Sequence, residues 1–151
     1  MQVVGEQAGI NGAPERSAVP GTVKIAHLAD LHLDVAFKWA GREAGGRWRR
    51  SIRATLTKAV EVALEEGVDA FFLGGDIYEH DLVAPDTARF MVEALARLDP
   101  IPVLVAPGNH DYLCPSSVWV QASWSPNVRY FAFDRWEAVE LVDGLTIWGT
   151  A

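Results

Sequence analysis

Three short apolar segments, separated by two stretches of helical periodicity, constrain the fold of this chain more than any other feature. The apolar segments cover residues 23–29, 69–73 and 102–106. Between them, apolar side chains recur every three or four positions over residues 47–66 and 85–98, which predicts two helices. The side chains expected to face the core are Ile52, Leu56, Ala59, Val60, Ala63 and Leu64, then Phe90, Met91, Ala94, Leu95 and Leu98. This β-α-β-α-β order predicts an α/β fold with a parallel sheet whose strand ends meet at one edge.

The rest of the chain follows a different pattern. Residues 1–22 have no apolar core and predict a flexible leader, and a loop rich in Gly and Arg follows the first strand. A short helix is expected over residues 115–124, and strands over 128–133, 136–142 and 145–148. Asp143-Gly144 is a hairpin turn signal between the last two strands. These strands are expected to begin a second sheet.

Composition limits where the protein works and what it binds. The net charge of −7 gives no overall electrostatic reason to bind nucleic acid. A local basic patch remains open, because five arginines fall within residues 42–53, although a solvated helix face explains them equally well. Cys114, the single cysteine, excludes an internal disulfide and predicts a reducing, cytoplasmic compartment; we expect it to be a small buried residue. No apolar run is long enough for a membrane helix.

Groups that can bind metals follow each of the three strands. The first strand ends in Asp30-Leu31-His32, the second in Gly74-Gly75-Asp76, and the third in Gly108-Asn109-His110-Asp111. In an extended chain, residues i and i+2 share a face, so Asp30 and His32 are expected to converge. Each motif is unspecific by itself. Packing gives apolar strands no reason to end three times in such groups, so we interpret the edge as a metal site.

These three blocks resemble the first signature blocks of the calcineurin-like metallophosphoesterases. Residues 27–33 (HLADLHL) and 74–79 (GGDIYE) are similar to the corresponding blocks of Mre11/SbcD-type DNA repair exonucleases. The match covers about residues 23–112. It implies an αββα sandwich, of which residues 23–151 would form the first half and the start of the second sheet. It also implies metal-dependent phosphodiester hydrolysis, with DNA as the favoured substrate.

The resemblance assigns roles residue by residue. Asp30 and His32 would bind the first metal, Asp76 would bridge two metals, and Asn109 would bind the second. His110 would act as the acid beside the metals, and Glu79, three positions after Asp76, would orient His110. Mixed oxygen and imidazole ligands suit Mn²⁺, and Fe or Zn²⁺ would also fit.

The remaining candidates receive structural interpretations. His27 is expected in the core, His80 at the surface, and Asp111 as a carboxylate that orients its loop. Core packing or loop anchoring is expected for the six tryptophans, with base stacking by Trp39 or Trp48 as the alternative.

The resemblance also leaves part of the site without a counterpart. The family completes its metal shell with later histidines, including a Gly-His-x-His block, whereas this chain has no histidine after His110. We therefore expect a partial domain that is inactive by itself. For the parent protein the resemblance implies an SMC-like ATPase partner of the Rad50/SbcC kind and allows a homodimer. A small-molecule phosphoesterase, such as a cyclic-nucleotide phosphodiesterase, and a non-catalytic, metal-poor binding module remain open.

Overall fold

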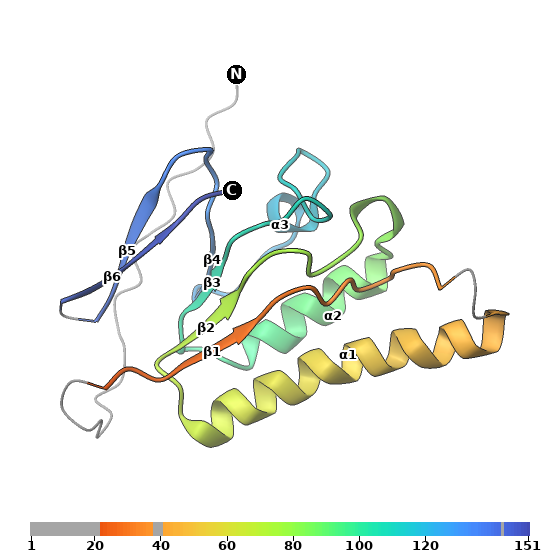
Figure 1. Cartoon of the computed structure of the whole chain (residues 1–151), viewed down its shortest axis with the longest axis horizontal. Helices are drawn as coiled ribbons and strands as arrows, with labels where there is room; N and C mark the ends of the chain where they lie inside the picture. Colours follow the sequence, from red (N-terminus) through yellow and green to blue (C-terminus); the bar gives the residue numbers. More distant parts are fainter. Residues whose placement is uncertain (1–21, 38–40, 143) are drawn as a thin grey trace.

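The structure, a computed structural model, describes residues 22–37, 41–142 and 144–151 (Figure 1). The predicted leader lies outside the described residues except for Thr22, and Trp39 and Asp143 lie outside them as well. The elements in order are β1 (Ile25–Leu28), α1 (Gly41–Glu66), β2 (Ala70–Leu73), the 3-10 helix η2 (His80–Leu82), α2 (Pro85–Ala96), β3 (Val103–Val105), α3 (Val118–Gln121), β4 (Val128–Tyr130), β5 (Glu137–Val142) and β6 (Leu145–Gly149).

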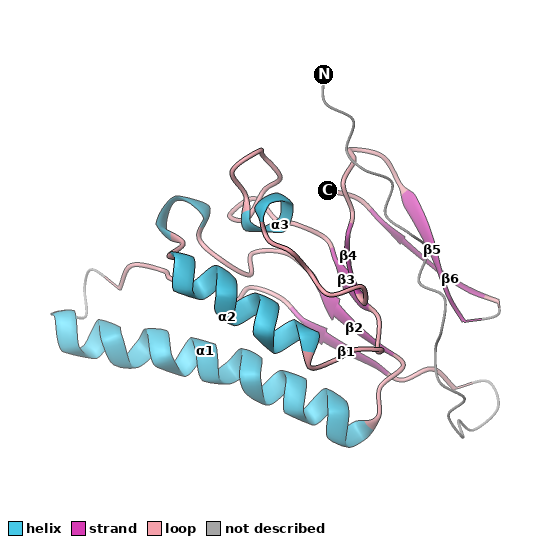
Figure 2. Ribbon diagram, turned by 180° about the vertical axis from the view of Figure 1, so that it is seen from behind, coloured by secondary structure: helices cyan, strands magenta, loops and turns pink. Residues whose placement is uncertain are grey.

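The main sheet is parallel, with strand order β1-β2-β3-β4. Helices α1 and α2 lie together on one face of it (Figure 2). Leu56 and Val60 of α1 and Met91 and Leu95 of α2 are fully buried in the core that contains Phe71 of β2. This confirms the predicted α/β fold, since the two amphipathic helices bury their apolar faces on the sheet.

Strand β4 corrects the prediction that all strands after Tyr112 belong to a second sheet. It pairs in parallel with β3, with Val128 opposite Val103. The buried side chain of Asn127 donates to the carbonyl of Ile101 (2.9 Å), and the backbone carbonyl of Asn127 accepts from Val103 N (2.8 Å). Asn127 therefore fastens the start of β4 beside β3. Of the strands in the described part of the chain, β5 and β6 form the separate antiparallel sheet.

Helix α1 begins at Gly41, so the expected loop rich in Gly and Arg is largely helical. Gly45 is buried beside Phe37, and an added Cβ there would make an ordinary contact with Phe37 at 3.6 Å. Tertiary packing thus overrides the low helix propensity of glycine. Leu64 is 41% exposed, contrary to the predicted core face, because it lies about 100° around the helix from the buried Ala63.

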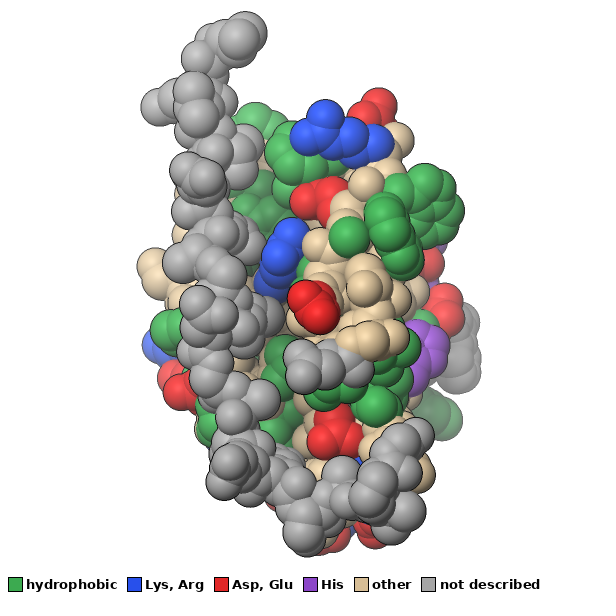
Figure 3. Space-filling model, turned by 90° about the vertical axis from the view of Figure 1, so that its left-hand side faces the viewer, with side chains coloured by type: hydrophobic (Ala, Val, Ile, Leu, Met, Phe, Trp, Pro, Cys, Tyr) green, Lys and Arg blue, Asp and Glu red, His purple; other side chains and the backbone are tan. Residues whose placement is uncertain are grey.

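The β5–β6 hairpin covers part of the second face of the sheet. Val139 packs there with Leu104 and Phe131. The outer face of the hairpin carries Trp136 and Trp148, which are 68% and 61% exposed, and hydrophobic side chains are visible on this side of the molecule (Figure 3). The expectation of core packing or anchoring is wrong for these two tryptophans.

The other tryptophans that the structure describes differ among themselves. Trp119 is buried and stacks on Trp124 at 5.2 Å, as expected, whereas Trp48 is 51% exposed. No helix in the described part of the chain is long and apolar enough to span a lipid bilayer.

Candidate metal centre

The loops after β1 and β2 run side by side at the carboxyl edge of the sheet. Asp30 N donates to the carbonyl of Gly75 (3.1 Å), and His32 N donates to the carbonyl of Asp76 (2.9 Å). Potential ligand atoms of Asp30, His32 and Asp76 lie within 4.8 Å of one another. The structure therefore brings together three of the residues that the sequence indicated as metal ligands.

The convergence has a different cause from the one expected. Asp30, His32 and Asp76 have φ angles of 54°, 51° and 55°, and Asp34 has 66°. Their backbone is in the left-handed conformation and not in the extended conformation of a strand. Turns therefore direct their side chains, and the alternation of side chains along a strand does not. Such a conformation costs a non-glycine residue about 1–3 kcal/mol, and it persists where the surroundings enforce it. Among the residues that the structure describes, positive φ outside glycine is confined to these two loops.

Asp111 holds the second and third loops together. Its fully buried carboxylate accepts from the backbone N–H of Asp76 (3.0 Å), Ile77 (3.1 Å) and Gly108 (2.6 Å), and from the indole N–H of Trp119 (3.2 Å). These contacts confirm that Asp111 orients the loops. Four donors on one carboxylate fix the backbone of Asp76 and help to stabilise its left-handed conformation.

Glycines allow the loop after β2 and the loop after β3 to contact each other through their backbones. Gly75 has φ of 85°, and a Cβ there would lie 3.0 Å from Gly108 Cα. A Cβ on Gly108 would overlap the Asp76 carboxylate and lie 2.6 Å from Asp76 N. Any side chain at position 108 would therefore displace the carboxylate from the site.

Glu79 contacts two histidines rather than the one expected. Nδ1 of His32 donates to Oε1 of Glu79 (2.7 Å), and Nδ1 of His110 donates to Oε2 (3.0 Å). The hydrogen bond to Glu79, followed by the negative charge of Glu79, raises the pKa of His110 above its usual value. Both rings are thereby oriented through Nδ1, which leaves each Nε2 free for a metal or substrate. The sequence offered no signal for the contact with His32.

The third loop supplies the other predicted residues. Backbone N of His110 donates to Oδ1 of Asp76 (2.9 Å), and Asn109 is exposed next to it. His32, Glu79 and His110 form a second group whose potential ligand atoms lie within 4.8 Å. Asn109 and His110 lie in a bend of the loop after β3.

Three residues outside the site differ from the expectation. His27 is exposed, because it alternates with Ala26 and Leu28, which pack against the main core. His80 is half-buried rather than exposed; its ring packs on Tyr112 at 4.8 Å. Cys114 is also only half-buried, with Sγ 3.5 Å from Nε2 of His80.

Arg53 of α1 secures the loop that carries His32. Its guanidinium lies 2.9 Å from Asp86, 3.7 Å from Asp34 and within hydrogen-bonding distance of Thr87. The hydrogen bond from Arg53 lowers the pKa of Asp86. Asp34 in turn accepts from Ala84 N (2.9 Å), so one network connects the first loop, α1 and the start of α2.

Arg53→Met is expected to lower the free energy of unfolding by about 1–3 kcal/mol, since Asp34, 11% exposed, would lose its counter-charge. Urea unfolding measures this change. Arg89→Met is the matched control, because Arg89 is 73% exposed and its pairing with Glu93 spans 4.0 Å. Equal effects of the two substitutions would contradict the role of Arg53.

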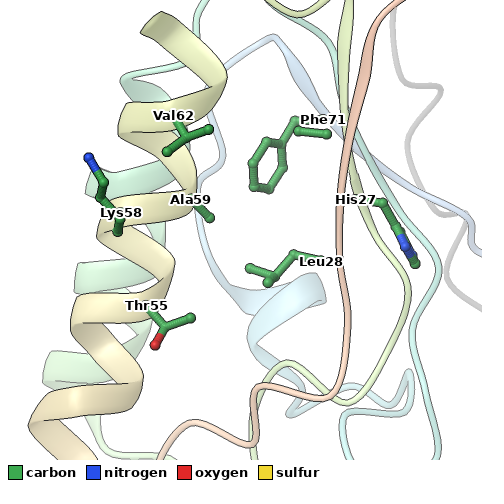
Figure 4. Close-up of a pocket in the computed structure, with 8 residues that line it drawn as sticks. His27, Leu28, Thr55, Lys58, Ala59, Val62 and Phe71 are labelled. Carbon is green, nitrogen blue, oxygen red and sulfur yellow. The ribbon is translucent and has the colours of Figure 1, made fainter. Parts of the chain in front are cut away.

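A separate apolar groove of about 450 Å³ lies between α1 and the edge of the sheet (Figure 4). Its walls include Ala26, Leu28 and Phe71 from the strands and Thr55, Ala59 and Val62 from α1. None of the metal-site residues lines it, so it is distinct from the candidate metal centre.

The donor set fits divalent cations. Asp30 and Asp76 converge, and in the part of the chain that the structure describes neither has a Lys or Arg partner within 4.0 Å. Two uncompensated carboxylates with an imidazole form a mixed oxygen and nitrogen set that suits first-row divalent metals.

Comparisons with known proteins identify the family. A model of the calcineurin-like phosphoesterases matches residues 23–150. The DNA double-strand break repair protein Mre11 of Archaeoglobus fulgidus is 34% identical over 92 residues, 59% of this chain and 19% of that protein. The uncharacterized metallophosphoesterase YhaO of Bacillus subtilis is 31% identical over 111 residues, 70% of this chain and 27% of that protein. One subunit of the nuclease SbcCD of Rhodobacter capsulatus is 31% identical over 93 residues, 59% of this chain and 22% of that protein.

The chain thus aligns with about a fifth to a quarter of the length of these relatives. The family model, in contrast, matches nearly the whole segment that carries the sheet and its loops. Together with the converging ligand groups, this shows that the chain belongs to the calcineurin-like phosphoesterase family.

Proposed function

We propose that the protein hydrolyses phosphoesters with the help of two divalent metal ions. The observation that carries the proposal is the convergence of Asp30, His32 and Asp76 on one edge, without a cationic side chain among the described residues to balance the carboxylates. Asp30, His32 and Asp76 would hold one ion, and Asp76 and Asn109 would contribute to the second. When bound, such ions attract the phosphate and activate a water molecule.

His110 serves as the proton donor to the leaving oxygen. Its Nδ1 is fixed by Glu79 and its backbone by Asp76, so Nε2 faces away from these contacts. Glu79 is a positioning residue, because its carboxylate holds the rings of His32 and His110. Proton donation of this kind contributes about 10²–10⁴-fold to the rate.

The finer proposal is a DNA repair exonuclease with Mn²⁺ as the metal. The names of two relatives, a DNA double-strand break repair protein and a nuclease subunit, support DNA as the substrate. The resemblance to Mre11/SbcD-type exonucleases supports an SMC-like ATPase of the Rad50/SbcC kind as a partner and is compatible with a homodimer. The single cysteine supports a cytoplasmic location.

Two other functions are the alternatives. One is a small-molecule phosphoesterase, such as a cyclic-nucleotide phosphodiesterase, because the matching family model is described by phosphoester chemistry and not by DNA. The other is a metal-poor binding module without catalysis. The three functions are distinguished by measuring whether the full-length gene product hydrolyses DNA, bis-p-nitrophenyl phosphate and cyclic AMP. The nuclease proposal fails if the two small esters are cleaved and DNA is not.

Metal binding by this chain tests the site directly. We expect weak Mn²⁺ binding, near one ion per chain, with negligible nuclease activity, because among the described residues we assign only Asp76 and Asn109 to the second ion. Asp76→Asn should abolish binding and leave the stability of the metal-free chain equal or higher, since it relieves repulsion with Asp30 and its oxygen can still accept from His110 N. Calorimetric titration and urea unfolding measure both effects. Marked destabilisation of the metal-free variant would assign Asp76 a structural role instead.

A further inference from the structure

We propose that His32, Glu79 and His110 form a zinc-binding site that is separate from the proposed two-metal centre and competes with it for His32. The potential ligand atoms of these three residues lie within 4.8 Å of one another. We call them the His₂Glu site. Zinc binding there is independent of the proposed function, whereas its inhibitory effect rests on that function.

The two histidines approach one carboxylate from two sides. Nδ1 of His32 lies 2.7 Å from one oxygen of Glu79, and Nδ1 of His110 lies 3.0 Å from the other. The two rings are nearly perpendicular, at 85°, with centroids 4.9 Å apart. The side chains of His32, Glu79 and His110 are 30%, 18% and 44% exposed, so a cation can enter from solvent and keep a water ligand. One Zn²⁺, with ligand distances of about 2.0–2.2 Å, can take the place of the two N–H protons.

Backbone hydrogen bonds hold the His₂Glu site together without a metal. N of Glu79 donates to the carbonyl of Leu33, the residue after His32 (2.9 Å). N of His80, the residue after Glu79, donates to the carbonyl of His110 (3.0 Å). The three loops are therefore fixed relative to one another before a cation arrives, and a preorganised site loses little conformational freedom on binding.

The ligands of the His₂Glu site favour zinc over manganese. Two imidazoles and one carboxylate, with a fourth position open to water, are a common set of zinc ligands. Imidazole suits zinc, whereas carboxylate oxygens suit manganese. The other group, Asp30, His32 and Asp76, has two carboxylates and one imidazole. The two groups therefore differ in their preferred metal although they share His32.

The shared imidazole makes the two groups mutually exclusive. A neutral imidazole carries its proton on one nitrogen and binds a metal through the other. While Nδ1 of His32 donates to Glu79, its Nε2 is free for the ion of Asp30 and Asp76. When Zn²⁺ occupies Nδ1, the proton moves to Nε2, and that ion loses its imidazole ligand. Zinc on Nδ1 of His110 likewise prevents the doubly protonated ring that a proton donor requires.

Calorimetric titration of this chain with Zn²⁺ and with Mn²⁺ tests the proposal. Asp76→Asn should abolish Mn²⁺ binding and retain Zn²⁺ binding, because Asp76 does not belong to the His₂Glu site. The double variant D76N/H110Q should bind Zn²⁺ at least about 100-fold more weakly than Asp76→Asn does, more than the loss of an outer-shell partner costs. D76N/H80Q is the matched control and should keep the zinc affinity of Asp76→Asn, although Cys114 lies 3.5 Å from His80. Circular dichroism shows whether each variant is folded.

Nitrogen NMR of the histidine rings identifies the zinc ligands directly. Zn²⁺ should shift Nδ1 of both His32 and His110 in the wild type. A shift at Nε2 of His32 with none at His110 would place the zinc between Asp30 and Asp76 and overturn the proposal, as would loss of zinc binding in Asp76→Asn or an equal loss in the two double variants.

The zinc site and the proposed function can fail separately. Zinc binding by Asp76→Asn, with no hydrolysis of any phosphoester by the full-length gene product, rejects the proposed function alone. Mn²⁺-dependent hydrolysis by the full-length gene product, with no zinc binding by Asp76→Asn, rejects the zinc site alone.

Discussion

Asp111→Asn is expected to lower the free energy of unfolding by about 2–4 kcal/mol and to weaken Mn²⁺ binding, although Asp111 need not touch a metal. Its two carboxylate oxygens accept from four N–H groups that belong to Asp76, Ile77, Gly108 and Trp119. Asparagine has one acceptor oxygen, and its NH₂ group would face N–H donors. At least one buried donor would lose its partner, and the left-handed backbone of Asp76 would lose its anchor.

Urea unfolding in EDTA measures the stability of Asp111→Asn, and calorimetric titration measures its affinity for Mn²⁺. Asp134→Asn provides the control, because Asp134 is exposed and should change stability by less than about 0.5 kcal/mol. If Asp111→Asn is as stable as the wild type, the carboxylate does not organise the loops. If stability falls and metal affinity is unchanged, the conformation of Asp76 does not depend on Asp111.

His110→Gln in the full-length enzyme is expected to reduce single-turnover cleavage by about 10²–10⁴-fold while metal content and DNA binding stay near normal. The substitution preserves the backbone N–H that donates to Asp76, so the geometry of the metal ligands is retained. It removes the imidazole whose Nδ1 is held by Glu79. Glutamine cannot protonate the leaving oxygen, and the loss therefore falls on the rate.

His32→Gln is the contrasting variant, because the ring of His32 lies in one group of potential metal ligands with Asp30 and Asp76. It should lose metal first and activity as a consequence, and excess Mn²⁺ should partly restore the rate. The alternative is that His110 is itself a ligand, in the group that it forms with His32 and Glu79. An empty metal site in His110→Gln, or rescue of that variant by Mn²⁺, would establish this alternative.

The first half of the fold and the residues of the candidate site follow from the sequence alone. Short apolar segments with helical periodicity between them have few solutions other than parallel strands with crossover helices. The strand ends of such a sheet share one edge, and this is enough to place Asp30, His32 and Asp76 together. The turn signal at Asp143-Gly144 likewise predicted the β5–β6 hairpin, whose strands pair as expected.

The way in which these residues are held depends on tertiary contacts. Glu79 contacts His32 and His110 across separations of 47 and 31 residues, and Asp111 reaches Asp76 across 35. Local periodicity cannot encode such pairs, because the partners are chosen by which loops the sheet places together. The left-handed backbone at Asp30, His32 and Asp76 runs against local preference and is imposed by these contacts. Tertiary contacts likewise placed β4 in the first sheet, beside β3. The glycine-rich start of α1 is helical because packing outweighs the low helix propensity of glycine, about 1 kcal/mol per residue.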